Sequence, residues 1–297
     1  PTPALLLDLG ALDRNITRMA AFFASGTCRL RPHVKAHKTL EIARRQLAAG
    51  SCSGLTCATV SEAEMVAPIC DDLLIANEIV SAPKCERVAA LARRTRITVA
   101  VDSLAGLDAL SRAARAGGVR VGVLVDVNVG QNRCGVEPGE AALTLARRAV
   151  QSDALDLRGV MGYEGHLQPV RDRAERESRT RHAMQGLVHT ADEFRATGFP
   201  CDVVSAGGTG TYDISGRVEG VTEIQAGSYA LMDTDYSSVG VPFEAAFSVL
   251  GTVISRPSRE RCVADCGHKA SSKDHGFPTV RGIDGAVVTA LNDEHAT

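Results

Sequence analysis

The sequence predicts an α/β protein, a TIM-type (β/α)8 barrel with a second, smaller β-rich domain. Eight short runs rich in β-branched residues alternate with longer amphipathic runs rich in Ala, Leu and Arg. Strands separated by helices pair in parallel through βαβ crossovers, and eight such units in about 210 residues fit one barrel. After Tyr236 the alternation stops, and strand-like runs follow one another without helices. The 297 residues, 44% of them apolar, are enough for one large core or two moderate ones.

The barrel elements alternate in order along the chain. The strand candidates are CRLRPHV (28–34), SGLTCATV (53–60), DLLIANEIV (72–80), ITVAVDS (97–103), VRVGVLVDVNV (119–129), LRGVMGYEG (157–165), CDVVSAG (201–207) and VTEIQAGS (221–228). The helical patterns between them are TLEIARRQLAAG (39–50), VSEAEMVAPI (60–69), APKCERVAALARR (82–94), LAGLDALSRAARAGG (104–118) and PGEAALTLARRAVQ (138–151). Their apolar residues recur every three or four positions, and several patterns end in Gly, as helices do. The charged run PVRDRAERESRTRH (169–182) is interpreted as a solvated helix face.

The β-rich unit is predicted from three runs without helices between them. They are FSVLGTVISRP (247–257), RCVADCG (261–267) and GAVVTAL (285–291). The N-terminal run PTPALLLDL, which precedes a first helix at 11–24, is expected to join this unit. The predicted domains are therefore a barrel at 11–235 and a β-rich domain formed by 1–10 and 236–297, whose C-terminal part we expect to be missing from the chain.

Composition disfavours several classes of partner. A net charge of −2, 4% aromatic residues and no Trp offer no basic footprint or stacking surface for nucleic acid. No apolar run approaches the roughly 18 residues that span a bilayer, and the N-terminus lacks secretory-signal features. We therefore expect a cytoplasmic protein without nucleic-acid or membrane partners. The nine cysteines include no CxxC pair, which favours buried free thiols over a cysteine zinc site.

The stretch RPHVKAHKT (31–39) places two lysines and two histidines at the end of the first strand. A solvated basic loop is the simplest alternative, but barrels of this type collect their chemistry at the carboxyl ends of strands. Turns after strands seven and eight, SAGGTGTY and AGSY, are rich in Gly, Ser and Thr, and such turns frequently bind phosphate. A flexible glycine turn remains the alternative there. The predicted cofactor ligands in these turns are Ser205, Gly207, Gly208, Thr209, Gly227, Ser228 and Tyr229.

A phosphate site opposite a lysine suggests pyridoxal 5′-phosphate, whose aldehyde would form a Schiff base with Lys35. Desolvation or a neighbouring cation lowers the pKa of such a lysine, and Arg31 and Lys38 are near it in sequence. Lys35 is preferred to Lys38 because Lys38 lies farther from the strand and is expected to open the next helix.

The ordered set of motifs resembles the fold-type III pyridoxal-phosphate enzymes that share the alanine racemase barrel, and within them the D-threonine aldolase/D-serine dehydratase family. The resemblance covers essentially the whole chain. It is carried by PTPALLLDL, LRPHVKAHKT, TVSEAE, NVGQNRCGV, GVMGYEGHLQ, SAGGTGTY, TEIQAGSYALMD and VADCGHKASSKDHG.

The resemblance implies roles for individual residues. Lys35 matches the Schiff-base lysine, and Arg133 matches the arginine near the cofactor's phenolic oxygen and the substrate carboxylate. Tyr163 falls where the racemases have a ring-stacking histidine, and Gln225 falls where they have an arginine facing the pyridine nitrogen. The family also binds a divalent metal (Mn, Mg or Zn) through a C-terminal pair of ligands, expected here to lie beyond Thr297. His268, His275 and His295 are replacement candidates, and a surface or supporting role is the simpler interpretation of each.

The leading functional prediction is cleavage of D-3-hydroxy amino acids to glycine and an aldehyde, with His166 as base for the β-hydroxyl proton. A D-serine or 3-hydroxyaspartate dehydratase, with Lys35 as the base at the α-carbon, is the nearest alternative. A racemase is disfavoured by Gln225, and a non-catalytic cofactor carrier by the second domain. The resemblance further implies a homodimer.

Overall fold

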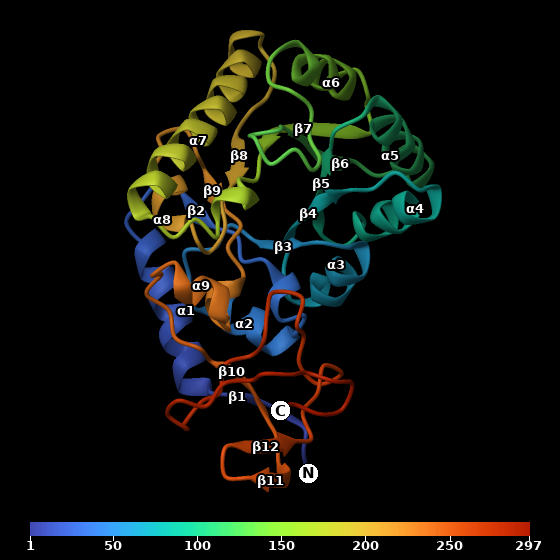
Figure 1. Cartoon of the computed structure of the whole chain (residues 1–297). Coiled ribbons are helices and arrows are strands. Elements are labelled where there is room, and N and C mark those ends of the chain that lie inside the picture. Colours follow the sequence, from blue (N-terminus) through green and yellow to red (C-terminus); the bar gives the residue numbers. More distant parts are fainter. The chain divides into compact units, whose positions relative to one another are not determined.

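The computed structural model describes all 297 residues and divides into two compact units. Residues Ile16–Tyr229 form the barrel unit, and Pro1–Asn15 with Ala230–Thr297 form the second unit. Figure 1 shows the helices of the barrel unit around its strands. The boundaries between the two units lie a few residues from the predicted domain limits. The domain limits themselves stay a prediction.

The barrel unit contains one eight-stranded parallel sheet. Its strands are β2 (Arg29–Leu30), β3 (Leu55–Cys57), β4 (Asp72–Glu78), β5 (Arg96–Val101), β6 (Val121–Asp126), β7 (Leu155–Met161), β8 (Val203–Ala206) and β9 (Glu223–Ile224). They run in the order β2-β9-β8-β7-β6-β5-β4-β3. Isolated parallel bridges from Leu30 to Cys52 and from His33 to Thr56 link the two ends of this order. The prediction of an eight-stranded TIM-type barrel is confirmed.

Helices follow the strands, and capping side chains fix where several of them begin. They are α1 (Leu9–Phe23), α2 (Leu40–Ala48), α3 (Val60–Val66), α4 (Ala82–Leu91), α5 (Leu104–Gly117), α6 (Glu140–Val150), α7 (Arg173–Ala196) and α8 (Tyr212–Ser215). The side chains of Thr59, Ser103 and Asp172 each accept a hydrogen bond from the backbone N–H three residues on, which satisfies a donor of the first turn. Helix α5 ends at Gly118, whose φ of 63° is the left-handed conformation that glycine tolerates.

Short 3-10 helices connect several elements, and two of them matter for the site. They are η1 (Val34–Ala36), η2 (Ala67–Ile69), η3 (Gly165–Leu167) and η4 (Ser228–Ala230). Helix η1 follows β2 and η3 follows β7, so both belong to the edge formed by the carboxyl ends of the strands.

Apolar side chains from consecutive strands fill the barrel. One buried cluster takes a residue from each of β4 to β8: Leu74, Ala100, Leu124, Met161 and Val203. Near the amino ends of the strands lies a buried charge, because the Arg31 guanidinium donates to both carboxylate oxygens of Glu223 at 2.8 Å and to Asp72 Oδ1 at 2.9 Å. Removing either carboxylate would leave part of a buried guanidinium unpaired, which is strongly destabilising.

The second unit holds two small antiparallel sheets. Strand β1 (Ala4–Leu7) pairs with β10 (Phe247–Leu250), which places the N-terminal run in this unit, and β11 (Val253–Ser258) pairs with β12 (Arg261–Ala264). Helix α9 (Thr234–Ser238) precedes them. The strand predicted at 285–291 is wrong: this run forms only single bridges, because Asn292 N–H donates to the His295 carbonyl and turns the chain back after a few residues.

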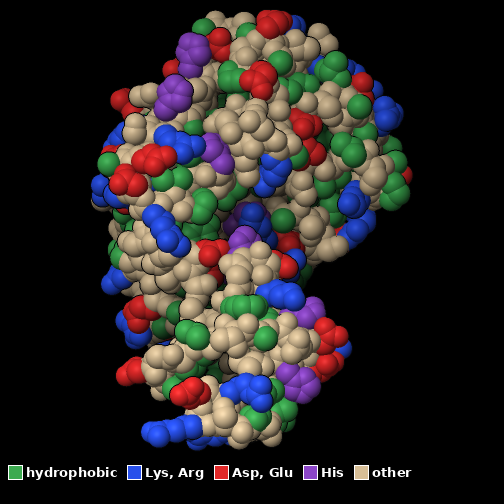
Figure 2. All heavy atoms as spheres, in the orientation of Figure 1, with side chains coloured by type: hydrophobic (Ala, Val, Ile, Leu, Met, Phe, Trp, Pro, Cys, Tyr) green, Lys and Arg blue, Asp and Glu red, His purple; other side chains and the backbone are tan.

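No helix combines the length and apolar character needed to cross a membrane. Charged side chains of both signs are intermixed over the face seen in Figure 2. All nine cysteines are free thiols, five of them buried, and burial raises the pKa of Cys28 and of Cys52 to about 12. Cys134 and Cys262 are exposed, so the expectation of buried thiols holds for part of the set only.

Candidate active site

The two histidines of RPHVKAHKT build the turn that presents Lys35. His33 Nδ1 accepts a hydrogen bond from Lys35 N–H at 3.4 Å, and its own backbone N–H donates to the Ala226 carbonyl at 3.0 Å. His37 Nδ1 accepts from Thr39 N–H at 3.1 Å, and its Nε2 lies 3.1 Å from Gln46 Oε1. Burial lowers the pKa of both histidines. The two imidazoles are therefore neutral and partnered inside the protein, and the turn that they build presents the Lys35 side chain, which is exposed.

The pKa of Lys35 is lowered mainly by desolvation and then by the positive charge of Arg133, while Glu62 acts in the opposite direction. The two cations proposed from sequence have other partners. Arg31 is buried between Glu223 and Asp72, and Lys38 Nζ pairs with Glu62 Oε1 at 3.1 Å. The neighbouring cation is thus Arg133 and neither Arg31 nor Lys38. A lowered pKa increases the fraction of neutral amine, the form that attacks a carbonyl.

Three predicted residues converge at the carboxyl ends of the strands. Lys35 Nζ lies 5.8 Å from the centroid of the Tyr163 ring, and Arg133 Cζ lies 5.5 Å from the same centroid. These residues follow β2, β7 and β6 respectively. The aromatic ring therefore lies within reach of both cations, a favourable arrangement for positive charge beside a π face.

The loop that carries Arg133 is shaped by Asn128. Its Oδ1 accepts from the N–H groups of Gly130 and Asn132, both at 3.1 Å, and a bridge from Val127 to Val136 closes the loop. Gly135 has a φ of 96°, and a Cβ there would lie 2.8 Å from Asn128 N. The QNRCG motif thus requires its glycine for both conformation and space.

The two Gly-rich turns leave backbone donors unused. Thr209, Gly227 and Ser228 make no hydrogen bond through their backbone N–H to any protein atom, although Thr209 and Gly227 are buried. A Cβ at Gly227 would lie 2.5 Å from the His33 carbonyl oxygen, so the close approach of the turn after β9 to the segment that carries Lys35 depends on glycine. Buried backbone N–H groups are nearly always paired. Unpaired donors from two adjacent turns therefore fit an anion such as phosphate.

Other predicted ligands make hydrogen bonds inside the protein. Ser205 is buried and its Oγ accepts from Gln225 Nε2 at 2.8 Å, while the buried Tyr229 hydroxyl accepts from Gln46 Nε2 at 3.0 Å. The N–H of Gly207 donates to Glu164 Oε2 at 3.2 Å, and that of Gly208 donates to Thr211 Oγ1 at 3.4 Å. Cofactor contacts by Ser205, Gly207, Gly208, Gln225 and Tyr229 stay predictions.

His166 lies on η3 beside the loop that carries Arg133. A Cβ at Gly130 would lie 3.4 Å from His166 Cε1, and the buried Nδ1 of His166 has no hydrogen-bond partner. Desolvation, followed by the charge of Arg179, lowers the pKa of His166, and Glu164 opposes this. A neutral imidazole at neutral pH can accept a proton.

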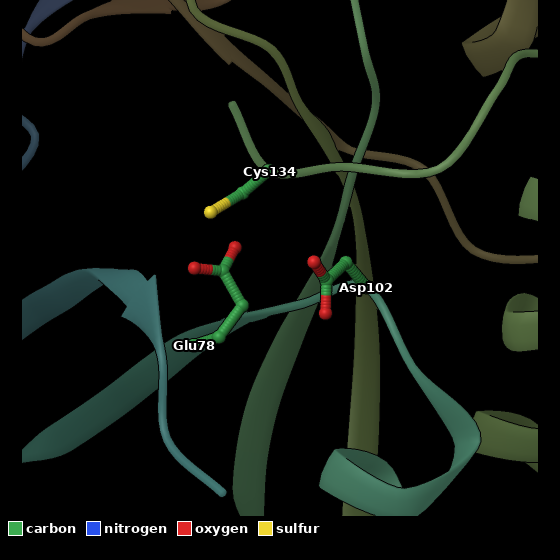
Figure 3. Close-up of side chains that lie close together, drawn as sticks. All are labelled: Glu78, Asp102 and Cys134. Atoms are coloured by element: carbon green, nitrogen blue, oxygen red, sulfur yellow. The ribbon is translucent and has the colours of Figure 1, made fainter. Parts of the chain in front are cut away.

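Acidic groups gather on the opposite side of the barrel mouth. Ligand atoms of Glu78, Asp102 and Cys134 all lie within 4.8 Å of one another. Figure 3 shows the thiol directed toward the Glu78 carboxyl group, with Asp102 beside it. Desolvation, then a hydrogen bond and the charge from Glu78, raise the pKa of Asp126 to about 8, and Arg133 lowers it.

The metal candidates among the histidines are not assembled into a site. Glu78, Asp102 and Cys134 are the single group of three potential ligands, and it contains no histidine. His268 Nε2 faces Asp293 at 3.2 Å, and His275 Nδ1 faces Asp235 at 3.1 Å. His295 belongs to no three-ligand group. These positions do not fit the family's metal site.

Sequence reasoning missed Glu164, Gln168 and Asp126. Asp126 had a signal, as a carboxylate inside the apolar run VRVGVLVDVNV. Glu164 and Gln168 stand in YEGHLQ, where polar residues are ordinary for a loop, and only their burial distinguishes them.

Comparison with known proteins gives concordant matches over the whole chain. Residues 7–235 match the family described as alanine racemase, N-terminal domain, and residues 246–297 match a putative serine dehydratase domain. The D-threonine aldolase of Arthrobacter sp is 40% identical over 299 residues, which cover 99% of this chain and 79% of that protein. The crystal structure of D-threonine aldolase from Filomicrobium marinum superposes with a TM-score of 0.97 at 41% identity, covering 100% of this chain and 81% of that one. D-threo-3-hydroxyaspartate dehydratase from Delftia sp. HT23 gives 0.90 at 30% identity, covering 100% and 83%.

Proposed function

Since this chain belongs to the alanine racemase-like family, we propose that it is a pyridoxal-phosphate-dependent lyase that cleaves D-3-hydroxy amino acids to glycine and an aldehyde. The observation that carries the proposal is the convergence of Lys35, Arg133 and Tyr163 next to two turns with unused backbone donors. An amine with a lowered pKa and an anion site at the same mouth match the two ends of this cofactor.

The residues of the chain have separable roles in holding the cofactor. Lys35 would hold its aldehyde carbon, and the N–H groups of Thr209, Gly227 and Ser228 would bind its phosphate. Gln225, whose amide nitrogen donates to Ser205 Oγ, would present a neutral amide and not a cation to the ring. When bound, pyridoxal phosphate supplies an electron-withdrawing ring that stabilises negative charge at the α-carbon of an amino acid.

Bond cleavage between the α- and β-carbons requires that the β-hydroxyl lose its proton. His166 is the proposed base, because it lies beside the loop that carries Arg133 and its lowered pKa keeps the imidazole neutral and able to accept a proton. Arg133, on the neighbouring loop, would bind the substrate carboxylate, since a guanidinium matches a carboxylate with two parallel hydrogen bonds. The two residues would thereby fix the substrate at both ends of the breaking bond.

A divalent metal (Mn, Mg or Zn) remains part of the proposal through the family resemblance alone. The histidines of this chain form no ligand group, and no step is assigned to a metal. Titration of Mn, Mg or Zn into the purified protein, with activity and calorimetric binding followed together, tests the requirement.

A dehydratase is the second candidate, favoured by the TM-score of 0.90 to D-threo-3-hydroxyaspartate dehydratase. In that case Lys35 would take the α-proton and the β-hydroxyl would leave. Incubation with pyridoxal phosphate, a divalent metal and D-threonine separates the two: glycine plus acetaldehyde supports the aldolase, whereas a 2-oxo acid plus ammonia contradicts it.

We further propose a cytoplasmic homodimer. Large apolar side chains of the second unit are exposed, among them Leu5, Val253, Ile254, Ile283 and Val287. Exposed apolar patches mark interaction surfaces. Sedimentation equilibrium with one molecular mass of about twice the 31.3 kDa chain is the expected result, and a monomer at micromolar concentration would contradict it.

A further inference from the structure

Glu164 is a fully buried carboxylate directly behind the proposed phosphate-binding turn. It follows β7 in the motif YEGH, its exposed fraction is 0%, and it forms no ion pair. A buried charge without a counter-ion is costly unless several donors surround it. The protein supplies three hydrogen-bond donors to this one side chain.

All three donors come from the segment after β8. Thr211 Oγ1 and Ser215 Oγ each donate to Glu164 Oε1 at 2.7 Å, and Gly207 N–H donates to Glu164 Oε2 at 3.2 Å. Thr211 Oγ1 in turn accepts from Gln168 Nε2 at 2.8 Å and from Gly208 N–H. The loop after β7 is thus joined to the loop after β8 by a closed set of hydrogen bonds.

These contacts determine which backbone donors of the turn remain available. The N–H groups of Gly207 and Gly208 point to Glu164 and Thr211, and Gly210 N–H donates to Gln168 Oε1 at 2.7 Å. Thr209 lies between them, and its N–H is left without a protein partner. The hydrogen bonds on both sides of Thr209 therefore fix the backbone of the turn and leave this one N–H free to bind a ligand.

We propose that Glu164 is a positioning residue that holds the turn after β8 in the conformation that presents the Thr209 N–H to the cofactor's phosphate. This inference rests on the proposed pyridoxal-phosphate binding. Glu164 acts through the backbone of the turn and touches neither substrate nor reacting atoms.

Glu164→Gln is a sharp test because an amide cannot satisfy the three donors. Thr211 Oγ1 already accepts two hydrogen bonds, so it can only donate to residue 164. The amide oxygen must face Thr211 and Ser215, and the amide nitrogen then faces the Gly207 N–H. Two donors opposed in a buried site cost about 1–3 kcal/mol, which corresponds to roughly a ten- to hundredfold change in an equilibrium constant.

The measurement is the dissociation constant of the apoprotein for pyridoxal phosphate and, separately, for pyridoxal, which has the same aldehyde and no phosphate. Both are followed by the visible absorbance of the bound compound, and the thermal midpoint of each apoprotein is recorded alongside. The expected result for Glu164→Gln is a roughly ten- to hundredfold loss of preference for the phosphorylated compound, with pyridoxal binding changed less than about twofold. Glu164→Asp, which keeps the charge but shortens the side chain, should fold and lose a smaller part of this preference.

Glu219→Gln is the matched control, because Glu219 is exposed and the same charge is removed. It should leave the preference unchanged. Wild-type preference in both Glu164 variants, or an equal loss of pyridoxal and pyridoxal-phosphate binding, would overturn the positioning role. Absence of pyridoxal-phosphate binding by the wild-type protein would instead overturn the proposed function itself, together with this inference.

Discussion

Glu164, on one side of the barrel mouth, is a buried carboxylate with three hydrogen-bond donors, whereas Asp126, on the other side, faces the carboxyl group of Glu78. The first arrangement satisfies the carboxylate oxygens with hydrogen bonds and joins two loops. The second raises the pKa of Asp126 to about 8, so that the Asp126 carboxyl group is largely protonated at neutral pH. A buried carboxyl group is thus a hydrogen-bond acceptor at Glu164 and a group that titrates near neutral pH at Asp126.

Lys35 has neighbours on both sides of the barrel mouth. The Tyr163 ring lies near its amine, and the charge of Arg133 lowers its pKa. Lys35→Ala should therefore have the largest effect. We expect turnover of D-threonine to fall by a factor on the order of 10⁴ or more, because the amine that holds the cofactor is removed. Lys38→Ala is the control, since Lys38 pairs with Glu62. Equal losses in the two variants, measured as initial rates, would contradict the assignment.

His166→Ala removes the proposed base on the side of Glu164. The expected loss in kcat is about 10²- to 10⁴-fold, the usual contribution of a general base, with cofactor absorbance unchanged. His182→Ala, on the exposed part of α7, is the control. Near-normal turnover of His166→Ala would remove this residue from the mechanism.

Asp126→Asn breaks the titratable pair without changing its shape. A folded-state pKa raised from 3.8 to about 8 means that the native protein binds the proton more tightly than the unfolded chain. This contribution to stability is fully present below pH 3.8 and is lost as the pH rises to about 8. The free energy of unfolding of the variant relative to wild type should therefore increase with pH, by up to about 1.4 kcal/mol per pH unit. This increase should level off once the pH exceeds the folded-state pKa of about 8.

Urea unfolding of both proteins, from about pH 5 to about pH 9, measures this difference in the free energy of unfolding. Asp71→Asn, at an exposed aspartate just before β4, is the control. A pH-independent difference between wild type and Asp126→Asn would show that the pair does not hold a proton.

Arg133→Gln should have the smallest effect of these variants, a change in the pKa of the Lys35 amine. The charge of Arg133 contributes to the lowered pKa of Lys35, so its removal raises that pKa and reduces the neutral fraction at a given pH. The rate of pyridoxal binding to the apoprotein should fall at neutral pH and recover at higher pH. Arg133→Lys keeps the charge and should keep the wild-type profile, and identical profiles for all three proteins would contradict the coupling.

The order of barrel elements and Lys35 could be predicted because their signals are local. Alternating apolar periods mark the strands, and a lysine directly after a strand end is placed by the barrel geometry itself. The second unit was harder, since the run 285–291 reads as a strand but lacks a partner long enough for a ladder.

Long-range partners explain what sequence could not supply. Arg31 is four residues from Lys35 in the chain, yet its charge is taken by Glu223 and Asp72, while Arg133 from a distant loop acts on the amine. Likewise Glu164 finds its donors 43 to 51 residues away. Such contacts form only when folding brings the strand ends together, so no local sequence pattern predicts them.

The most direct test of the account is to identify the lysine that holds the cofactor. Sodium borohydride added to the protein with pyridoxal phosphate fixes the cofactor to that lysine, and peptide mapping by mass spectrometry locates the label. The account predicts one labelled site, Lys35 within RPHVKAHKT. Label at Lys38 or spread over surface lysines would contradict it.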